Sequence, residues 1–467
     1  MPLRNLVIVF AAAMLSLVCY QRASRNRYVA TLTEAMNEIT TQYVDEVEPR
    51  KLFDGAMDGM VKQLDPNSGY TSPEDYEHFK ESLDQEFGGV GIMVEVNAET
   101  NRLTVMSPLI GTPAYRAGMK AGDVIMAIND QDTQKLTLKD AVDLMRGPEG
   151  SKVKVTVVNA GDSALVDFEL RRAVIPIETV LGDIRKSDGS WVFTLEDEPH
   201  IGYIRLVNFG ERTRDELRAA LHALTRPELK IDGLILDLRG NAGGLLKAAV
   251  ETCDMFLDEG QIVSTRGRGK VMKSSASAVK GVEMPRDVPL SIIIDKYSAS
   301  ASEIVAACLQ DHHRAAIIGQ RSWGKGTVQN IIQLEGGRSA LRLTVASYWR
   351  PSGVDIHKRK GALDSDDWGV RPDPGLEVNL TDDQAEQVSR ARRARDTSIQ
   401  GQEPPAKEPP AEIKRPELTV EPPVPIPQLE GTDEPPASST AEDPQLKKAI
   451  EHLQQQIDRR ANEPRRA

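Results

Sequence analysis

A serine at position 300 stands where a nucleophile could be activated. The run from Leu290 to Asp295 is apolar and rich in β-branched residues, which predicts a strand, and Glu303 to Leu309 has a helical pattern. The small and hydroxylated residues between them predict a tight turn. Because the first N–H groups of a helix are unpaired and its dipole is positive there, an oxyanion formed beside Ser300 would be stabilised. Ser300 is therefore the candidate nucleophile.

The same residues also fit a purely structural motif. Ser300-Ala301-Ser302-Glu303 matches the S-x-x-E capping box, in which the serine begins the helix and performs no chemistry. Capping is the commoner use of a serine in this position. The turn alone leaves both interpretations open.

A lysine 25 residues later could serve as the base. Lys325 lies between two glycines, a setting that lets the backbone pass close to another element. A lysine can activate a serine only if burial lowers its pKa well below the free value of about 10.4, and the apolar run Ala315 to Ile318 permits such burial. Gln329 follows within the alternating segment Thr327 to Leu334, which predicts a strand.

These residues resemble a known family. SASASE, SWGKG and Gln329, in this order and spacing, are similar to the C-terminal processing (tail-specific) proteases, which use a Ser-Lys dyad. The resemblance implies that Ser300 is the nucleophile, Lys325 the general base and Gln329 the residue that orients the lysine, with no cofactor and no metal. Some members also have an aspartate that matches Asp311. Eleven residues of helix span about 16 Å, so we expect no direct contact between Asp311 and Ser300.

Two competing chemistries fit the residues poorly. Gly319 to Lys325 spells G-x-x-x-x-G-K, but a phosphate-binding loop then requires Ser or Thr where Gly326 stands, and a helix where the sequence alternates. A Ser-His-Asp triad would have to use His312 or His313, which lie about 18 Å along the helix that Ser300 begins. We expect neither nucleotide binding nor a histidine base.

A glycine turn could complete an oxyanion site. DLRGNAGGLL lies between a predicted strand and a predicted helix, so Gly243 and Gly244 are candidate backbone donors, although a simple tight turn would look the same. The family resemblance pairs the N–H of Gly243 with that of Ala301. This chain has Gly240 and Ala242 where the family commonly has Asn and Pro, which predicts a looser turn.

A second unit begins at Phe87. The segments FGGVGIMVEV and AGMKAGDVIMAIND, a helix at Thr137 to Arg146 and a strand at Val153 to Val158 resemble a PDZ domain that extends to about Arg172. Consecutive N–H groups in this unit could form a nest for a C-terminal carboxylate, and the next strand offers an edge for an extended peptide. The alternative is a small barrel that only packs against the catalytic domain and binds no peptide. The candidate carboxylate-binding residues are Gly89, Val90, Gly91 and Ile92.

Arg146, at the end of the PDZ helix, resembles a sensor arginine of some family members. We interpret it as the residue that relays PDZ occupancy to the active site. Solvation at the surface is the alternative, since arginine is mostly exposed in folded proteins.

Composition narrows the class of protein. A length of 467 residues predicts about three domains, and a net charge of −12 with 4% aromatic residues argues against a nucleic-acid partner. The mostly apolar run Leu6 to Tyr20, flanked by arginines, is typical of a signal peptide or an uncleaved anchor. We therefore expect an exported protein, periplasmic or otherwise extracytoplasmic, with a possible anchor in the inner membrane.

The end of the chain changes character. Thr381 to Asp396 is charged and helix-like, whereas Gln402 to Pro436 holds 11 of the 28 prolines and predicts a disordered linker. Four apolar residues then share one helical face, which predicts an amphipathic helix that docks on its own chain or on a partner. We favour its own chain. These residues are Leu446, Ile450, Leu453 and Ile457.

The sequence thus predicts an α/β catalytic domain, crotonase-like by resemblance, with an inserted PDZ domain, an N-terminal helical region and a disordered Pro/Glu-rich tail. The expected function is a serine endopeptidase that receives free C-termini of proteins or peptides, with a possible activating partner and possible homo-oligomers. The alternative is an inactive PDZ adaptor on a protease scaffold, against which the intact Ser300, Lys325 and Gln329 argue. The expected boundaries are 1–28 for the signal or anchor, 29–85 for the helical region, 86–172 for the PDZ domain, 173–377 for the catalytic domain, 378–440 for the charged helix and linker, and 441–467 for the last helix.

Overall fold

The computed structural model describes residues 3–23, 27–76, 86–97, 102–159, 164–186, 188–396 and 443–462. Its internal contacts group the chain into two units. The first contains Met1–Glu77 and Gln329–Val345, and the second contains His78–Val328 and Ala346–Ala467. The proline-rich stretch that the sequence assigns to a disordered linker lies outside the described residues.

The first unit is helical at its start, as predicted. Its elements are α1 (Leu3–Ala23), α2 (Arg27–Gln42), α3 (Pro49–Val61) and the short strand β1 (Gly69–Thr71). β1 pairs antiparallel with β20 (Ser339–Trp349), a long-range pairing that the local helical pattern did not predict. Arg50 of α3 binds Glu335 at 2.6 Å. No helix in the described ranges combines the length and the apolarity needed to cross a membrane.

The predicted PDZ region of the second unit folds as a small sheet with helices. The strand order is β3-β4-β5-β7-β8, with β6 beside β5, so β3 is an edge strand, and β2 pairs with β9. Thr137 and Asp140 form a capping box that begins α6, and Arg146 ends it. The bounds are β2 (Glu86–Gly89), β3 (Ile92–Val96), β4 (Leu103–Pro108), α5 (Pro113–Arg116), β5 (Val124–Ile128), β6 (Gln131–Asp132), η1 (Thr133–Lys135), α6 (Leu138–Met145), β7 (Lys152–Val158), β8 (Leu165–Arg171) and β9 (Ala173–Pro176).

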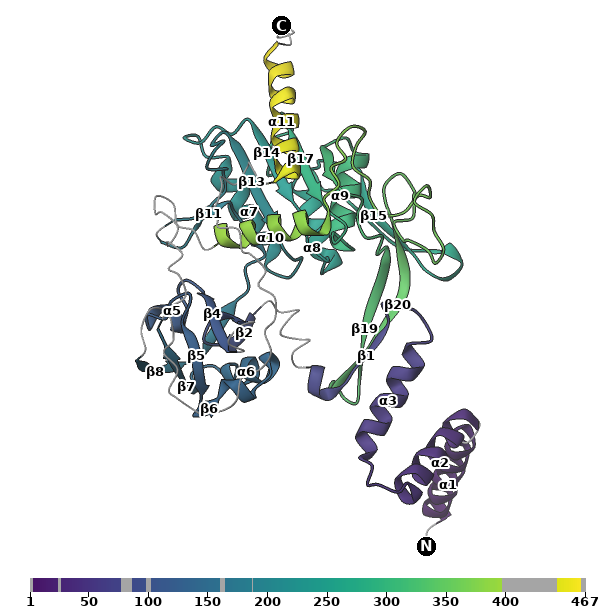
Figure 1. The fold of residues 1–467 in the computed structure, drawn as a ribbon. Helices are drawn as coiled ribbons and strands as arrows, with labels where there is room; N and C mark the ends of the chain where they lie inside the picture. Colours follow the sequence, from purple (N-terminus) through teal and green to yellow (C-terminus); the bar gives the residue numbers. More distant parts are fainter. Residues whose placement is uncertain are drawn as a thin grey trace. The chain divides into compact units, whose positions relative to one another are not determined.

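A second sheet, with the order β10-β13-β14-β17-β18, lies at the centre of the rest of this unit (Figure 1). Its last four strands are parallel and alternate with helices, which confirms the predicted α/β class. The bounds are β10 (Val180–Leu181), β11 (Ile184–Arg185), β12 (Trp191–Val192), β13 (Ile201–Leu206), α7 (Thr213–Leu224), β14 (Gly233–Asp237), α8 (Leu246–Asp254), β17 (Leu290–Ile294), α9 (Ala301–Asp311) and β18 (Ala315–Gly319).

Further strands pair outside the central sheet. β15 pairs antiparallel with both β16 and β20, and β19 pairs with β20. The charged stretch after residue 380 is helical, as predicted. The bounds are β15 (Gln261–Arg266), η2 (Arg268–Lys270), β16 (Met272–Ser277), β19 (Thr327–Leu334), α10 (Asp382–Asp396) and α11 (Pro444–Asn462).

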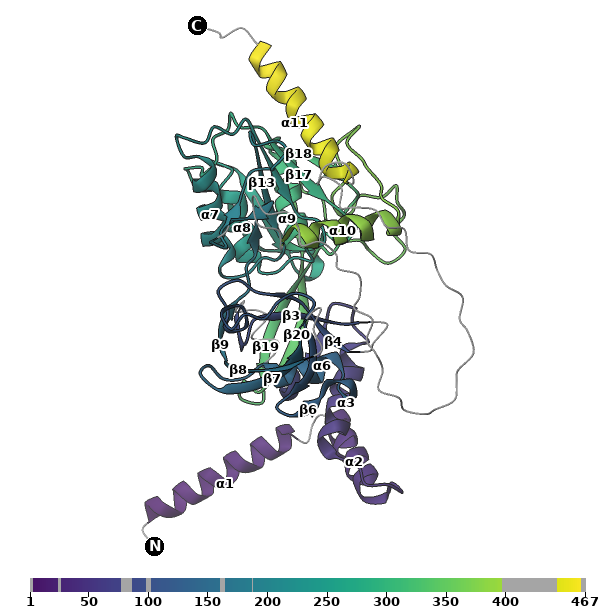
Figure 2. The ribbon, with the colours of Figure 1, turned by 60° about the vertical axis from the view of Figure 1, so that its left-hand side comes forward.

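The central sheet is apolar on both faces, and its residues alternate between two clusters. Leu234 and Leu236 of β14 pack in the cluster that includes residues of α7, α8 and α9. Ile235 packs in the other cluster, and α11 contributes the helical residues of that cluster on the opposite side of the sheet (Figure 2). The prediction that the last helix docks on its own chain is therefore confirmed. Of the four predicted residues, Leu446, Ile450 and Leu453 are buried, together with Ala449, whereas Ile457 is only half-buried.

Candidate active site

Ser300 ends the turn between β17 and α9, and its backbone conformation is unusual. Its φ of 56° and ψ of −110° lie in a region that residues other than glycine rarely adopt, so the surrounding contacts must hold it there. The hydroxyls of its neighbours Ser298 and Ser302 donate to the carbonyls of Leu238 and Asn241, at 2.9 and 2.8 Å. These two bonds fasten the turn on both sides of the candidate nucleophile.

The hydroxyl of Ser300 has a phenolic neighbour. Burial raises the pKa of the Tyr348 phenol to about 12, and a hydrogen bond with Ser300 opposes that rise. The phenol is therefore protonated at neutral pH. Tyr348 belongs to the SYWRP segment, which the sequence comparison included only as part of the family resemblance, so its contact with Ser300 was not predicted.

Glu303 is the acceptor that ties this turn to the segment around Lys325. Its side chain is fully buried, and Oε2 accepts the backbone N–H groups of Ser300 at 2.8 Å and of Lys325 at 2.9 Å. Oε1 accepts the N–H of Gly324 and the hydroxyl of Ser322, both at 2.6 Å. The backbones of the candidate nucleophile and the candidate base thus share one carboxylate oxygen. Burial raises the pKa of Glu303 to about 7, while these hydrogen bonds lower it.

The glycines beside Lys325 allow a close approach of two backbones, as predicted. A Cβ atom on Gly326 would lie 2.2 Å from the backbone nitrogen of His357, and one on Gly324 would lie 2.7 Å from Cβ of Lys358. Lys325 itself is half-buried. The segment that carries it is therefore held between Glu303 on one side and residues 357–358 on the other.

The glycine turn after β14 touches Ser300 directly. Gly243 has a φ of 106°, and a Cβ atom there would lie 2.8 Å from Cβ of Ser300 and 3.0 Å from the nitrogen of Ala301. Both oxyanion candidates thus lie next to the candidate nucleophile. The N–H of Gly243, however, donates to Oδ1 of Asn241 at 2.9 Å in this conformation. An oxyanion could take that N–H only by replacing the Asn241 oxygen.

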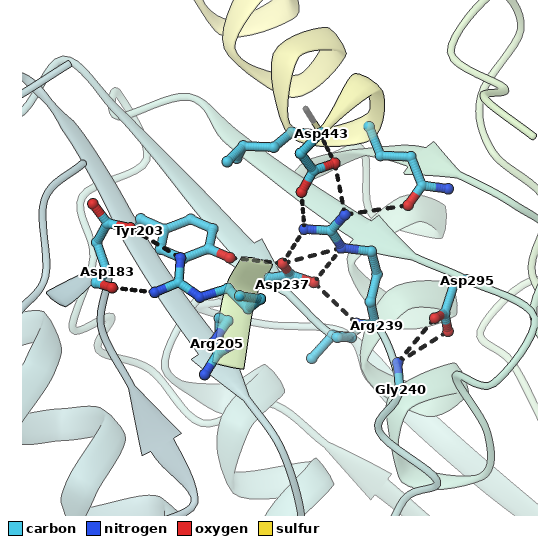
Figure 3. Close-up of polar contacts among 12 residues, drawn as sticks. Asp183, Tyr203, Arg205, Asp237, Arg239, Gly240, Asp295 and Asp443 are labelled. Carbon is cyan, nitrogen blue, oxygen red and sulfur yellow. Dashed lines mark hydrogen bonds and ion pairs between the residues drawn. The ribbon is translucent and has the colours of Figure 1, made fainter. Parts of the chain in front are cut away.

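Buried charges support the base of the same turn (Figure 3). Tyr203 donates to Asp237 at 2.8 Å, and Arg239 binds the same carboxylate at 2.7 Å. The nearby Arg239 guanidinium holds the pKa of Asp237 below its usual range despite complete burial. At the next residue, the N–H of Gly240 donates to both oxygens of Asp295, at 3.0 and 3.1 Å. These polar contacts depend on tertiary structure and were not predicted.

The predicted carboxylate-binding loop lines a cavity of about 110 Å³ in the PDZ region. Gly91 has a φ of 76°, and a Cβ atom there would lie 2.3 Å from Cβ of Thr112, so only glycine fits. The guanidinium of Arg146 lies 4.8 Å from the ring centroid of Phe87 at the same cavity. The lining residues are Phe87, Gly89, Val90, Gly91, Ile92, Val142, Met145 and Arg146.

Comparison with known proteins identifies the family. The model of peptidase family S41 matches residues 200–374, a PDZ domain model matches 104–159, and the model of the "Activating protease CtpB N-terminal domain" matches 17–74. A carboxy-terminal-processing protease of Bartonella bacilliformis is 40% identical over 357 residues, which cover 74% of this chain and 78% of the relative. The chain belongs to the carboxy-terminal-processing proteases of peptidase family S41.

Other relatives of this S41 protease carry similar names. A carboxyl-terminal-processing protease of Synechocystis is 36% identical and covers 70% of this chain and 71% of the relative. The protease CtpB of Bacillus subtilis is 34% identical, covering 72% and 67%. Among solved structures, the photosystem II D1 C-terminal processing protease is 27% identical, with a TM-score of 0.41 and coverage of 74% and 92%. The family predicted from the sequence is confirmed, and the protein is a serine peptidase with a PDZ domain.

Other predicted residues of the S41 protease have different surroundings. Gln329 belongs to the first unit, where its side-chain amide donates to the hydroxyl of Thr344 at 3.2 Å, so its action on the lysine stays a prediction. Asp311, at the end of α9, binds Arg350 at 2.5 Å, which gives it a structural partner. His312 bonds the carbonyl of Gln261 at 2.8 Å. Within the described ranges, no group of His, Cys, Asp and Glu is arranged to hold a metal ion.

The raised pKa of Glu303 predicts the pH dependence of the protease. A proton on Oε2 would displace the N–H of Ser300 or of Lys325, so we expect these two turns to loosen as the pH falls through about 7. A lysine base that must be neutral acts in the same direction. We therefore expect kcat/KM to fall by more than about tenfold per unit below pH 7, which exceeds the limit for a single ionisation. Initial rates between pH 5.5 and 9 test this expectation.

Two results would contradict it. If kcat/KM falls by only tenfold per pH unit, a single group titrates and Glu303 does not affect the rate. If kcat/KM is constant over this range, neither Glu303 nor a lysine base affects it.

Ionisation of Glu303 should also change the stability of the protein. Because the folded pKa of about 7 exceeds the usual 4.5, ionisation of Glu303 lowers the free energy of unfolding progressively between about pH 4.5 and pH 7, with no further loss above.

Proposed function

We propose that this protease cleaves peptide bonds with a Ser300–Lys325 dyad and selects substrates by their free C-termini. The observation that carries the dyad is the Glu303 carboxylate, because one of its oxygens holds the backbone N–H groups of both residues. In the proposed reaction, Lys325 removes the proton of Ser300 as Oγ attacks the substrate carbonyl. The proton then passes to the leaving amine, and water hydrolyses the acyl-enzyme.

The oxyanion of the tetrahedral intermediate would lie at the start of α9. Ala301 is the first residue of that helix, where N–H groups point outward and the helix dipole is positive. The N–H of Gly243 is the second proposed donor, and it becomes available when the oxyanion replaces Oδ1 of Asn241. This exchange costs little, because one buried acceptor takes the place of another.

Tail recognition is proposed for the PDZ cavity. Residues 89–92 line this cavity, and strand β3, which begins at Ile92, is at the edge of its sheet, where an extended peptide can pair. Occupancy would reach the active site through the orientation of the PDZ domain, with Arg146 as the proposed relay. A bound tail can shift that orientation only if it binds the active arrangement more tightly.

We expect C-terminal amidation of a substrate to lower its cleavage sharply. The measurement compares one peptide that ends in small apolar residues with its C-terminal amide, in wild type, Arg146→Ala and the exposed control Arg116→Ala. Amidation should cost wild type about tenfold or more in kcat/KM, because the carboxylate loses charge-assisted hydrogen bonds in the nest. Arg146→Ala should slow cleavage of the acid form while its PDZ domain still binds the tail. Equal cleavage of acid and amide would refute tail recognition.

The inactive-adaptor alternative has a direct test. A fluorophosphonate probe should label Ser300 of an active enzyme and leave an adaptor unlabelled. We also propose export to an extracytoplasmic compartment, homo-oligomers and a partner protein that activates the protease. The crotonase-like form of the α/β domain is likewise a proposal.

A further inference from the structure

The first turn of α11 is anchored to the glycine turn of the active site (Figure 3). Arg239 follows β14, and its guanidinium lies between two carboxylates. It binds Asp237 at 2.7 Å on one side and Asp443 at 2.9 and 2.8 Å on the other. Asp443 precedes α11 and accepts the backbone N–H of Leu446 at 3.0 Å, so one side chain both caps this helix and pairs with Arg239.

This ion pair is largely excluded from solvent. The side chains of Arg239 and Asp443 are only 11% and 10% exposed. Gln445, fully buried in the same turn of helix, accepts from Arg239 at 3.3 Å and donates to the carbonyl of Val378 at 2.9 Å. Loss of Asp443 would remove the acceptor that Nη1 and Nη2 of Arg239 share, and would leave the guanidinium with Asp237 and Gln445.

The other side of the glycine turn meets the nucleophile. Asp295 accepts the N–H groups of Gly240 at 3.0 Å and of Ser298 at 2.9 Å, so it joins the two turns. The N–H of Ala299 also donates to the carbonyl of Asn241 at 3.0 Å. Hydrogen bonds and the backbone of residues 239–243 therefore connect α11 to the backbone beside Ser300, through an exposed link at Gly240 and a buried one at Asn241.

We propose that Asp443 is a positioning residue for the reaction at Ser300, and that α11 must be seated on its own chain for full activity. The inference rests on the proposed function of Ser300. The S41 family match ends at residue 374, so it does not include this helix. Residues 397–442 separate α10 from α11, so α11 is not a continuation of α10.

Loss of Asp443 should affect catalysis through the backbone of residues 239–243. Without Asp443, Arg239 retains Asp237 as its carboxylate partner and can turn away from α11, and the backbone of residues 239–243 follows it. Gly243 then no longer lies firmly against Ser300. A displacement of about 1 Å at a reacting group can cost about 100-fold in rate. Neither Asp443 nor Arg239 lines the PDZ cavity, so substrate binding there should be unaffected. The loss should therefore appear in kcat and not in KM.

The test uses the full-length protein with two substitutions at Asp443 and two matched ones at Glu451, which is on the exposed face of the same helix. Asp443→Ala should lower kcat about 10- to 100-fold with KM within about twofold. Asp443→Asn should recover part of the loss, because asparagine still caps the helix and offers one acceptor. Glu451→Ala and Glu451→Gln should stay within about twofold of wild type.

Amide hydrogen exchange provides a readout that does not need activity. In Asp443→Ala, exchange should accelerate at residues 239–243 relative to both wild type and Glu451→Ala. Unchanged exchange there, or unchanged kcat with only a lower melting temperature, would overturn the inference and make α11 a merely stabilising helix. Failure of wild type to hydrolyse peptides or to be labelled at Ser300 would instead refute the proposed function, and the exchange result would still decide the role of Asp443.

Discussion

Ser300→Ala should abolish peptide hydrolysis, and Lys325→Ala and Lys325→Arg should do the same. Nucleophile and base act as one unit, so loss of either removes the covalent route, with an expected fall in kcat of about 10⁴-fold or more. Arginine retains the positive charge but cannot give up its proton at working pH, so it cannot replace the base. The measurement is initial-rate hydrolysis of a peptide, together with circular dichroism to verify folding.

The controls for this prediction come from the exposed surface. Ser298 and Ser302 look like natural controls in the sequence, but their buried hydroxyls hold the catalytic turn. Ser365→Ala and Lys360→Ala are better, since both positions are exposed. Wild-type rates in any of the three dyad variants, with a native spectrum, would exclude the proposed dyad.

Glu303→Gln should also be damaging, although it changes only one oxygen to an amino group. The carboxylate accepts four donors, two on each oxygen. Whichever way the new amide turns, at least one buried N–H meets another N–H in place of an acceptor. We expect a loss of about 1–3 kcal/mol in the free energy of unfolding and of about 100-fold in kcat, because the turns of Ser300 and Lys325 lose their common anchor.

Chemical denaturation and kcat, measured on the same preparation, test this second prediction. Glu259→Gln is the matched control, because Glu259 is exposed and the change in charge is identical. A Glu303→Gln protein with kcat within about twofold of wild type and an unchanged unfolding midpoint would show that Glu303 holds neither turn.

Local patterns in the sequence predicted the parts of the site that are close together along the chain. The strand before Ser300, the helix after it and the tight glycine backbone around Lys325 all follow from residue type and period. The capping-box motif was also correct in part, since Glu303 does accept the N–H of Ser300. Its bonds to Ser322 and Lys325 could not be predicted from that motif, because they bridge 19 and 22 residues.

The contact between Arg239 and Asp443 was even harder to predict from the sequence. It joins residues 204 positions apart, and both side chains would pass as ordinary surface charges in a helix or turn pattern. Periodicity indicated that α11 has an apolar face, but it could not indicate which surface that face covers. Similarly, Gly243 was a sound oxyanion candidate from its position, while its bond to Asn241 is a side-chain detail that only the folded turn reveals.

The two-sided apolar sheet has a consequence for the newly made chain. Ile235, Ile293 and Ile318 emerge from the ribosome long before the α11 residues that cover them. During that interval the sheet exposes an apolar face, which invites chaperones or self-association. If Asp443 also positions the active site, a partly synthesised or truncated chain contains the proposed nucleophile and base but lacks the helix that aligns them. Full activity would then require the completed polypeptide.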